Sequence, residues 1–243
     1  MKNLFLALSF LTIIPIETRK VHNPDDLGKA AAWFPLIGAL MGALLAGVYY
    51  GLQLIFPLPV SAVLATIFWV FLSGGLHLDG LADSCDGLLN ASSPERRLEI
   101  MKDPRLGSFG GIGLVLAIFL RVVLLNSIPI QEIFFALPLA AALGRWMLIL
   151  AALQPMARPG GLGDAFAKGL KQDTWMPAAL TVIFLVVLGG WKGIVGALLA
   201  HLLAIAVFSF AKRRLGGMTG DVFGLTVEIS ELSVLAAFCL TIG

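Results

Sequence analysis

Long apolar runs dominate this sequence and leave few folds open to it. Hydrophobic residues make up 58% of the chain and charged residues only 13%, against about 45–50% and about 25% in soluble domains. This composition excludes a soluble enzyme, a disordered protein and a nucleic-acid binder. Seven runs approach the roughly 20 residues that a membrane-spanning helix needs: 33–56, 60–76, 110–125, 133–153, 175–189, 193–211 and 229–242. We therefore predict an all-α, polytopic membrane helix bundle of about seven transmembrane spans, forming a single domain over residues 1–243.

Basic residues are unevenly distributed between the two sides of such a bundle. Fourteen of the 17 basic residues fall within four segments: 1–32, 77–109, 154–174 and 212–227. The other three are Arg121, Arg145 and Lys192. Seven spans place these four segments on one side of the membrane, and the positive-inside rule makes that side cytoplasmic. We expect the N-terminus in the cytoplasm and the C-terminus outside.

The N-terminal segment 1–28 shares some features with a signal peptide. Lys2 precedes an apolar stretch at 4–16, which is too short to span a bilayer and lacks a small-residue cleavage pattern. We expect a retained interfacial or re-entrant helix on the cytoplasmic side. Cys85 and Cys239 should lie near opposite faces, so we expect neither a disulfide between them nor a zinc site.

Three aspartates follow the second apolar run, within a cytoplasmic segment 77–109 that we expect to carry the active site. Asp79, Asp83 and Asp86 stand at i, i+4 and i+7, so a helix places them on one stripe about 60° wide. Their mutual repulsion favours a bound cation, and carboxylate oxygens suit Mg²⁺ or Mn²⁺. The alternative is a solvated helix face with unrelated acids. His77 lies off this stripe and is either an acid–base group or a cap at the interface.

A second candidate site is the loop that leads into the third apolar run. Lys102 and Arg105 precede a glycine-rich stretch that begins at Gly107. Backbone N–H groups at the start of a helix are suited to binding phosphate. The alternative is a flexible loop whose cations only orient the chain in the membrane.

Acidic residues also occupy the start of the last apolar run. Asp221, Glu228 and Glu231 share one face if this segment is helical, and acids inside a membrane are costly and usually functional. We expect them to complete the metal site, with Arg121 or Arg145 as alternative partners of Glu231. If the last helix starts later, these acids are simply solvated. The expected substrate contacts are Lys102, Asp103, Arg105, Gly107, Arg145 and Thr219.

Together these blocks resemble the cobalamin synthase family of bacterial inner membranes, the adenosylcobinamide-GDP ribazoletransferases. The resemblance is carried by residues 10–15, 33–38, 74–83, 100–107 and 216–221. It implies an enzyme that joins adenosylcobinamide-GDP to alpha-ribazole or its 5'-phosphate, with release of GMP and a requirement for Mg²⁺. The product would be adenosylcobalamin or its phosphate. We also expect a multi-pass inner-membrane protein that contacts lipid, with its active site facing the cytoplasm, as a homo-oligomer or with other corrinoid-pathway proteins.

Two other classes of membrane protein share some of these sequence features. CDP-alcohol phosphotransferases also use Asp-Gly and later Asp residues, but Asp79-Gly80 lacks the Ala-Arg pair of that family and the later aspartate spacing differs. A secondary transporter would need a second copy of the 74–87 pattern in the other half of the chain, and none is found there. No Ser, Cys or His stands out as a nucleophile, so we expect direct displacement, with a general base drawn from the aspartates or His77.

Overall fold

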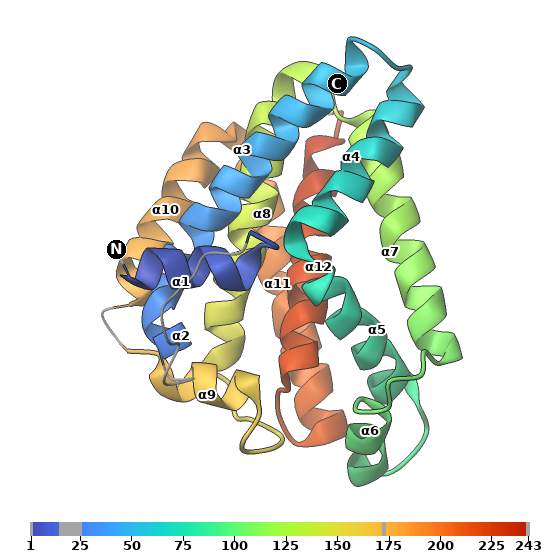
Figure 1. Cartoon of the computed structure of the whole chain (residues 1–243), viewed down its shortest axis with the longest axis vertical. Coiled ribbons are helices and arrows are strands. Elements are labelled where there is room, and N and C mark those ends of the chain that lie inside the picture. The colour runs from blue at the N-terminus through green and yellow to red at the C-terminus, as the bar shows by residue number, and fades with distance from the viewer. Residues whose placement is uncertain (1, 15–25, 172–173, 242–243) are drawn as a thin grey trace.

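The computed structural model describes residues 2–14, 26–171 and 174–241, and the regular elements in these ranges are helices. Figure 1 shows seven of them running roughly along the long axis of one bundle. They are α3 (Phe34–Gln53), α4 (Leu58–Ser73), α7 (Ser108–Ser127), α8 (Ile130–Ala152), α10 (Trp175–Leu188), α11 (Gly190–Leu215) and α12 (Gly220–Phe238). Each overlaps one of the seven apolar runs, so the prediction of an all-helical bundle is confirmed.

The number of membrane spans remains a prediction. Within the described ranges, four helical segments are long and apolar enough to cross a membrane, or five if the bent pair α4 and α5 (Leu76–Leu89) forms one span. Helix α10 has only 14 residues, and α12 carries three acids within its 19 residues. The outer faces of the long helices suit lipid, because large apolar side chains such as Phe119, Phe184 and Leu202 are exposed there.

Two adjacent glycines separate α4 from α5. Gly74 and Gly75 have φ values of 64° and 68°, in the left-handed region that side chains with a Cβ rarely adopt. The two helices meet at 91°. This bend lets α5 pack against α12 and α7 instead of continuing along the axis of α4.

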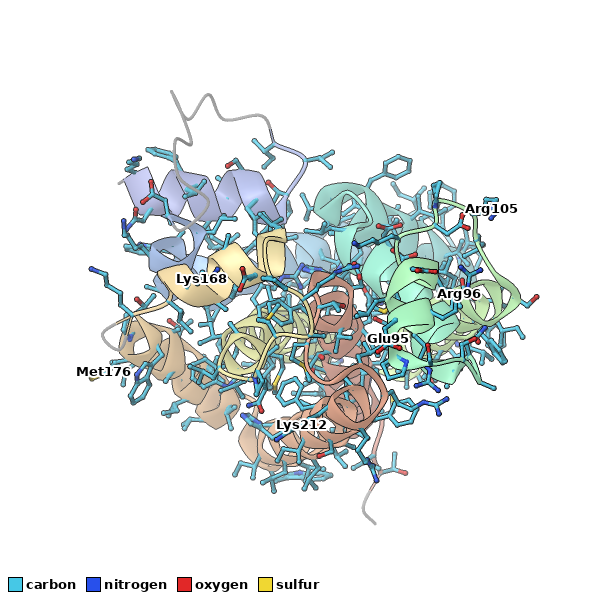
Figure 2. All side chains as sticks on the ribbon, turned by 90° about the horizontal axis from the view of Figure 1, so that it is seen from below. Glu95, Arg96, Arg105, Lys168, Met176 and Lys212 are labelled. Carbon is cyan, nitrogen blue, oxygen red and sulfur yellow. The ribbon has the colours of Figure 1, made fainter. Side chains whose placement is uncertain are left out.

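The short helices gather toward one end of the bundle. Figure 1 places α5, α6 (Pro94–Ile100) and α9 (Leu162–Gly169) low in the view, whereas the C-terminus lies at the top. We call this lower end the basic end, because Arg96, Arg105, Lys168 and Lys212 lie around it in the view from below (Figure 2). These cations belong to three of the four basic segments, 77–109, 154–174 and 212–227, which therefore share one end of the bundle.

The N-terminal part of the chain lies outside the bundle of long helices. Helix α1 (Lys2–Leu11) crosses the bundle at a steep angle in Figure 1, and α2 (Asp26–Ala30) and the 3₁₀ turn η1 (Ala31–Trp33) lead into α3. Part of the predicted interfacial segment, residues 15–25, lies outside the described ranges. The transverse direction of α1 fits an interfacial helix better than a spanning one.

Helix α8 forms the centre of the bundle, with 78% of its best apolar window buried. It packs closely on α3 at two glycines. A Cβ on Gly38 would lie 2.5 Å from the carbonyl oxygen of Ala141, and one on Gly42 would lie 2.3 Å from that of Leu137. Small residues at such contacts are typical of helices that pack in membranes.

Candidate active site

The site is built where α5 crosses α12. A Cβ on Gly80 would lie 2.8 Å from the carbonyl oxygen of Asp221, and one on Gly224 would lie 2.9 Å from the carbonyl oxygen of His77. Only glycine at both positions allows the two backbones to approach this closely. The contact brings Asp79 and Asp83 of α5 beside Asp221 of α12, which are separated by more than 130 residues in the sequence.

These three carboxylates, which we call the carboxylate face, are not matched by the same number of cations. Asp83 is within electrostatic range of Asp79 and Asp221 and of the guanidinium of Arg158. Arg158 Nη2 donates to Asp221 Oδ2 at 3.1 Å, and the Thr219 hydroxyl donates to the same oxygen at 3.3 Å. Within the described ranges, Asp79 and Asp83 make neither a side-chain hydrogen bond nor an ion pair. The expected grouping of Asp79, Asp83 and Asp221 is present in the structure.

The carboxylate face offers oxygen donors of the kind that Mg²⁺ prefers, but not a complete metal site. Among the described residues, no three His, Cys, Asp or Glu side chains are arranged closely enough to hold a metal by themselves. Mg²⁺ commonly binds one or two carboxylates and completes its shell with waters and substrate phosphates. Two carboxylates without cationic partners are the donor set that such binding uses.

Asp86 has a different role from the metal ligand that we expected. Its buried carboxylate accepts hydrogen bonds from the backbone N–H groups of Gly107, at 2.8 Å, and Gly110, at 2.9 Å. A Cβ on either glycine would lie 2.3 Å from an Asp86 oxygen. Asp86 therefore binds the N-terminus of α7, where a negative charge is favourable. The expected phosphate site at Gly107 is occupied by a carboxylate of the chain itself.

The expected substrate contacts on the loop before α7 also lie elsewhere. Arg105 is exposed and forms an ion pair with Asp103 at 2.6 Å, and this contact lowers the pKa of the Asp103 carboxyl to about 2. Lys102 is exposed on the same loop. Lys102, Asp103 and Arg105 do not line the cavity beside the carboxylate face.

Glu228 and Glu231 lie deeper on α12, in what we call the buried ion cluster. Arg121 of α7 donates to both carboxylates at 2.7 Å, and Arg145 of α8 donates to Glu231. The side chains are between 0% and 5% exposed. The Arg121 guanidinium also lies 4.3 Å from the centre of the Trp69 ring.

The buried ion cluster corrects two expectations. Its two guanidinium groups supply the positive charge that we expected from a metal at Glu228 and Glu231. For Glu231, an arginine partner was the alternative that the sequence left open. Arg145, with no exposed surface, contacts Glu231 rather than a substrate. Thr219 accepts a hydrogen bond from the Val222 N–H at 3.3 Å and caps α12. It also lines the cavity beside the carboxylate face, so its expected contact with substrate stays a prediction.

A cavity of about 230 Å³ opens beside the carboxylate face. Its lining comes from α1, α3, α5, α8, α9, α12 and the loop before α9, and includes Asp79, Asp221 and Arg158. His77 also lines it and is buried, with no hydrogen-bond partner for Nε2 among the described residues. His77 and Asp79 of α5 therefore line the same cavity.

Sequence reasoning missed the loop between α8 and α9 and helix α9 itself. An isolated bridge pairs Met156 with Met218, where the N–H groups of Ala157 and Met218 each donate at 2.8 Å across the contact. This pairing carries Arg158 to Asp221. Asp164 and Phe166 of α9 line the same cavity. In the sequence, Arg158 was distinguishable only as one cation of a cytoplasmic loop, and no local pattern marked Asp164 or Phe166.

Comparisons with known proteins identify the family of this chain. Residues 3–239 match the family model described as cobalamin-5-phosphate synthase. The adenosylcobinamide-GDP ribazoletransferase of Pseudomonas fluorescens is 40% identical over 97% of this chain and 98% of its own. The proteins of the same name from Klebsiella pneumoniae and Geotalea daltonii are 36% and 38% identical, over 97% and 95% of this chain and 98% and 94% of their own. No solved structure matches the chain. With a match over nearly its whole length, this chain belongs to the cobalamin-5-phosphate synthase family.

Proposed function

We propose that this protein transfers the activated corrinoid of adenosylcobinamide-GDP to alpha-ribazole or alpha-ribazole 5'-phosphate, with release of GMP and a requirement for Mg²⁺. The names of the relatives supply the reaction. The observation in this chain that carries it is the carboxylate face beside a cavity. A diphosphate donor brings negative charge to a site that is already acidic, so a cation must accompany it.

Asp79 and Asp83 are the residues that we assign to hold Mg²⁺, with Asp221 beside them. When bound, the ion would neutralise phosphate oxygens of the donor and of the departing GMP. Mn²⁺ accepts the same ligands. We assign Arg158 to contact the phosphate groups of the donor, because its guanidinium is paired with Asp221 and lines the cavity. Arg158 therefore replaces Lys102, Arg105 and Arg145 as the arginine or lysine that we assign to substrate phosphate.

The reaction also needs a proton acceptor for the attacking hydroxyl. In a direct displacement, the ribazole hydroxyl oxygen forms a bond to the phosphorus that carries the corrinoid, the bond from that phosphorus to GMP breaks, and the hydroxyl proton is lost. Asp79 and His77 both line the cavity and have an unpartnered acceptor atom among the described residues. These two groups are our candidates for the general base.

We further propose that the site faces the cytoplasm of a bacterial inner membrane. The basic end of the bundle supports this orientation. In a variant in which serines replace Cys85 and Cys239, a cysteine at Ser92 should resist a membrane-impermeant thiol reagent in intact cells. A cysteine at exposed Leu54, in the connection at the opposite end, should react. The reverse labelling pattern would contradict the orientation.

The decisive assay uses purified protein with adenosylcobinamide-GDP, alpha-ribazole and Mg²⁺. We expect GMP release that requires both ribazole and the metal, with a corrinoid product detected by mass. CDP-diacylglycerol with a common alcohol should give no CMP, which separates this activity from phospholipid synthesis. CMP release without any corrinoid product would overturn the proposal.

A further inference from the structure

One wall of the cavity is a continuous series of aromatic rings drawn from four separate helices. Phe10 of α1 stacks on Phe34 of α3 with ring centres 5.7 Å apart, and Phe34 stacks on Phe166 of α9 at 5.5 Å with an interplanar angle of 2°. Phe223 of α12 meets Phe166 edge-on at 6.3 Å. All four phenylalanines line the cavity. We call this set the aromatic wall.

Polar groups line the same cavity. Asp79 and Asp221 belong to the carboxylate face, Arg158 is paired with Asp221, and Asp164 stands two residues before Phe166. The Asp164 carboxylate is buried and accepts hydrogen bonds from the Gly160 N–H and from Lys168, both through Oδ2. The cavity therefore suits a ligand that combines a flat apolar ring with hydroxyl or phosphate groups.

Size restricts which part of the two substrates enters this space. A cavity of about 230 Å³ is smaller than the roughly 300–1,000 Å³ of a site for a drug-sized ligand. A corrin macrocycle is far larger than a drug-sized ligand and must stay outside. The remaining flat groups are the guanine and the adenine of the donor and the dimethylbenzimidazole of ribazole.

Hydrogen bonding distinguishes the two donor bases from the benzimidazole. Guanine and adenine carry donors and acceptors along their edges, and each one buried without a partner costs free energy. Dimethylbenzimidazole in its nucleoside has one ring nitrogen with a free lone pair and otherwise presents carbon. Phenylalanine side chains offer no hydrogen bonds but stack well on flat rings. The aromatic wall is therefore matched to the benzimidazole.

We propose that the aromatic wall binds the benzimidazole base of the acceptor, so that its ribose extends toward Asp164 and the carboxylate face. This inference rests on the proposed function and assigns the acceptor to one part of the site. It places the donor diphosphate at the carboxylate face, outside the wall. Helices α1 and α9, which lie beside the long-helix bundle, acquire a role as the two sides of the acceptor subsite.

The test compares the two substrates in one variant. Phe166→Leu keeps an apolar side chain but removes a stacking ring, and Phe10→Leu does the same on α1, where the side chain is only half-buried. Each should raise the KM for alpha-ribazole about tenfold, the value of one good aromatic stacking contact, and leave the KM for adenosylcobinamide-GDP unchanged. Calorimetric binding of alpha-ribazole to the purified protein, without donor, should weaken by the same factor.

Phe184→Leu is the matched control, because Phe184 is exposed on the outside of α10 and does not line the cavity; neither constant should move. A raised KM for the donor with unchanged ribazole binding would overturn the inference and assign the wall to a base of the donor. Unchanged constants for both substrates would also overturn it and leave the wall as packing. The wild-type protein could bind ribazole more tightly than the Phe10 and Phe166 variants and yet release no GMP. That result would support the acceptor subsite and contradict the proposed reaction.

Discussion

The first turn and the middle of α12 hold acidic residues in opposite circumstances. At the buried ion cluster, Glu228 and Glu231 face Arg121 and Arg145, so that charges of each sign are equal in number and all come from the chain. At the carboxylate face, Asp221 has Arg158, but Asp79 and Asp83 of α5 lie close by without cations of their own.

This difference indicates that the buried ion cluster has a structural role and the carboxylate face a chemical one. Charges buried in a medium of low dielectric are tolerated when they are paired and hydrogen-bonded, and the cluster meets that condition without any ligand. The carboxylate face does not meet it and is accessible from a cavity. We infer that the cluster holds α7, α8 and α12 together, whereas the carboxylate face is completed only by a cation and a substrate.

The largest effect should come from breaking the buried ion cluster. Arg145→Met leaves Glu231 with one guanidinium in place of two, and loss of a partner from a buried ion pair costs about 3–5 kcal/mol. Unfolding of the purified variant in detergent should show this loss. The double variant Arg145→Met/Glu231→Gln removes one charge of each sign and should be more stable than Arg145→Met.

A surface pair provides the control for this measurement. Arg96 and Glu99 form an exposed ion pair, so Arg96→Met should change the free energy of unfolding by less than about 1 kcal/mol. An Arg145→Met protein as stable as the wild type would contradict the structural role of the cluster.

The carboxylate face should show the opposite behaviour, a loss of activity without a loss of stability. Asp79→Asn and Asp83→Asn keep side-chain size and remove one charge each. Turnover should fall on the order of 10²-fold, which corresponds to about 2.7 kcal/mol of transition-state stabilisation, while the unfolding midpoint stays the same or rises because repulsion is relieved. Asp103→Asn, on the exposed loop, is the matched control. Near-normal turnover of both active-site variants at saturating Mg²⁺ would contradict the assignment of Asp79 and Asp83 to the metal.

The smallest effect should come from the exposed pair of Arg105 and Asp103. Arg105→Gln should leave turnover at neutral pH within about twofold of the wild type, because a surface ion pair contributes little. Since Arg105 lowers the pKa of Asp103 from 3.8 to about 2, the pair contributes to stability above about pH 4 and loses that contribution as the pH falls toward 2. The difference in stability between wild type and variant should therefore vanish in acid. A tenfold weaker binding of the donor would restore the substrate contact first expected of Arg105.

The sequence predicted features that depend on periodicity and local spacing. The apolar runs located the long helices, and the positions of Asp79, Asp83 and Asp221 indicated one acidic site. The sequence does not show why glycine is needed at positions 74, 80 and 224. Gly74 allows the bend between α4 and α5, and Gly80 and Gly224 allow α5 to contact α12, and both are tertiary features.

Where the sequence misled, the cause was competition between partners that local spacing does not reveal. Asp86 continues the aspartate stripe, yet the N–H groups of Gly107 and Gly110 bind it. Glu228 continues the acidic face of α12, yet Arg121 of another helix reaches it. Long-range pairing also explains why Arg158 escaped notice, since the contact of Met156 with Met218 carries it to the site.

The central claim is that a divalent cation binds the carboxylate face and not the other acids of the chain. Electron paramagnetic resonance of Mn²⁺, titrated into the purified protein with adenosylcobinamide-GDP present, measures this binding directly. We predict that Asp79→Asn and Asp83→Asn each weaken Mn²⁺ binding at least tenfold, while Asp103→Asn binds as the wild type does. Undiminished Mn²⁺ binding by both active-site variants would contradict the account.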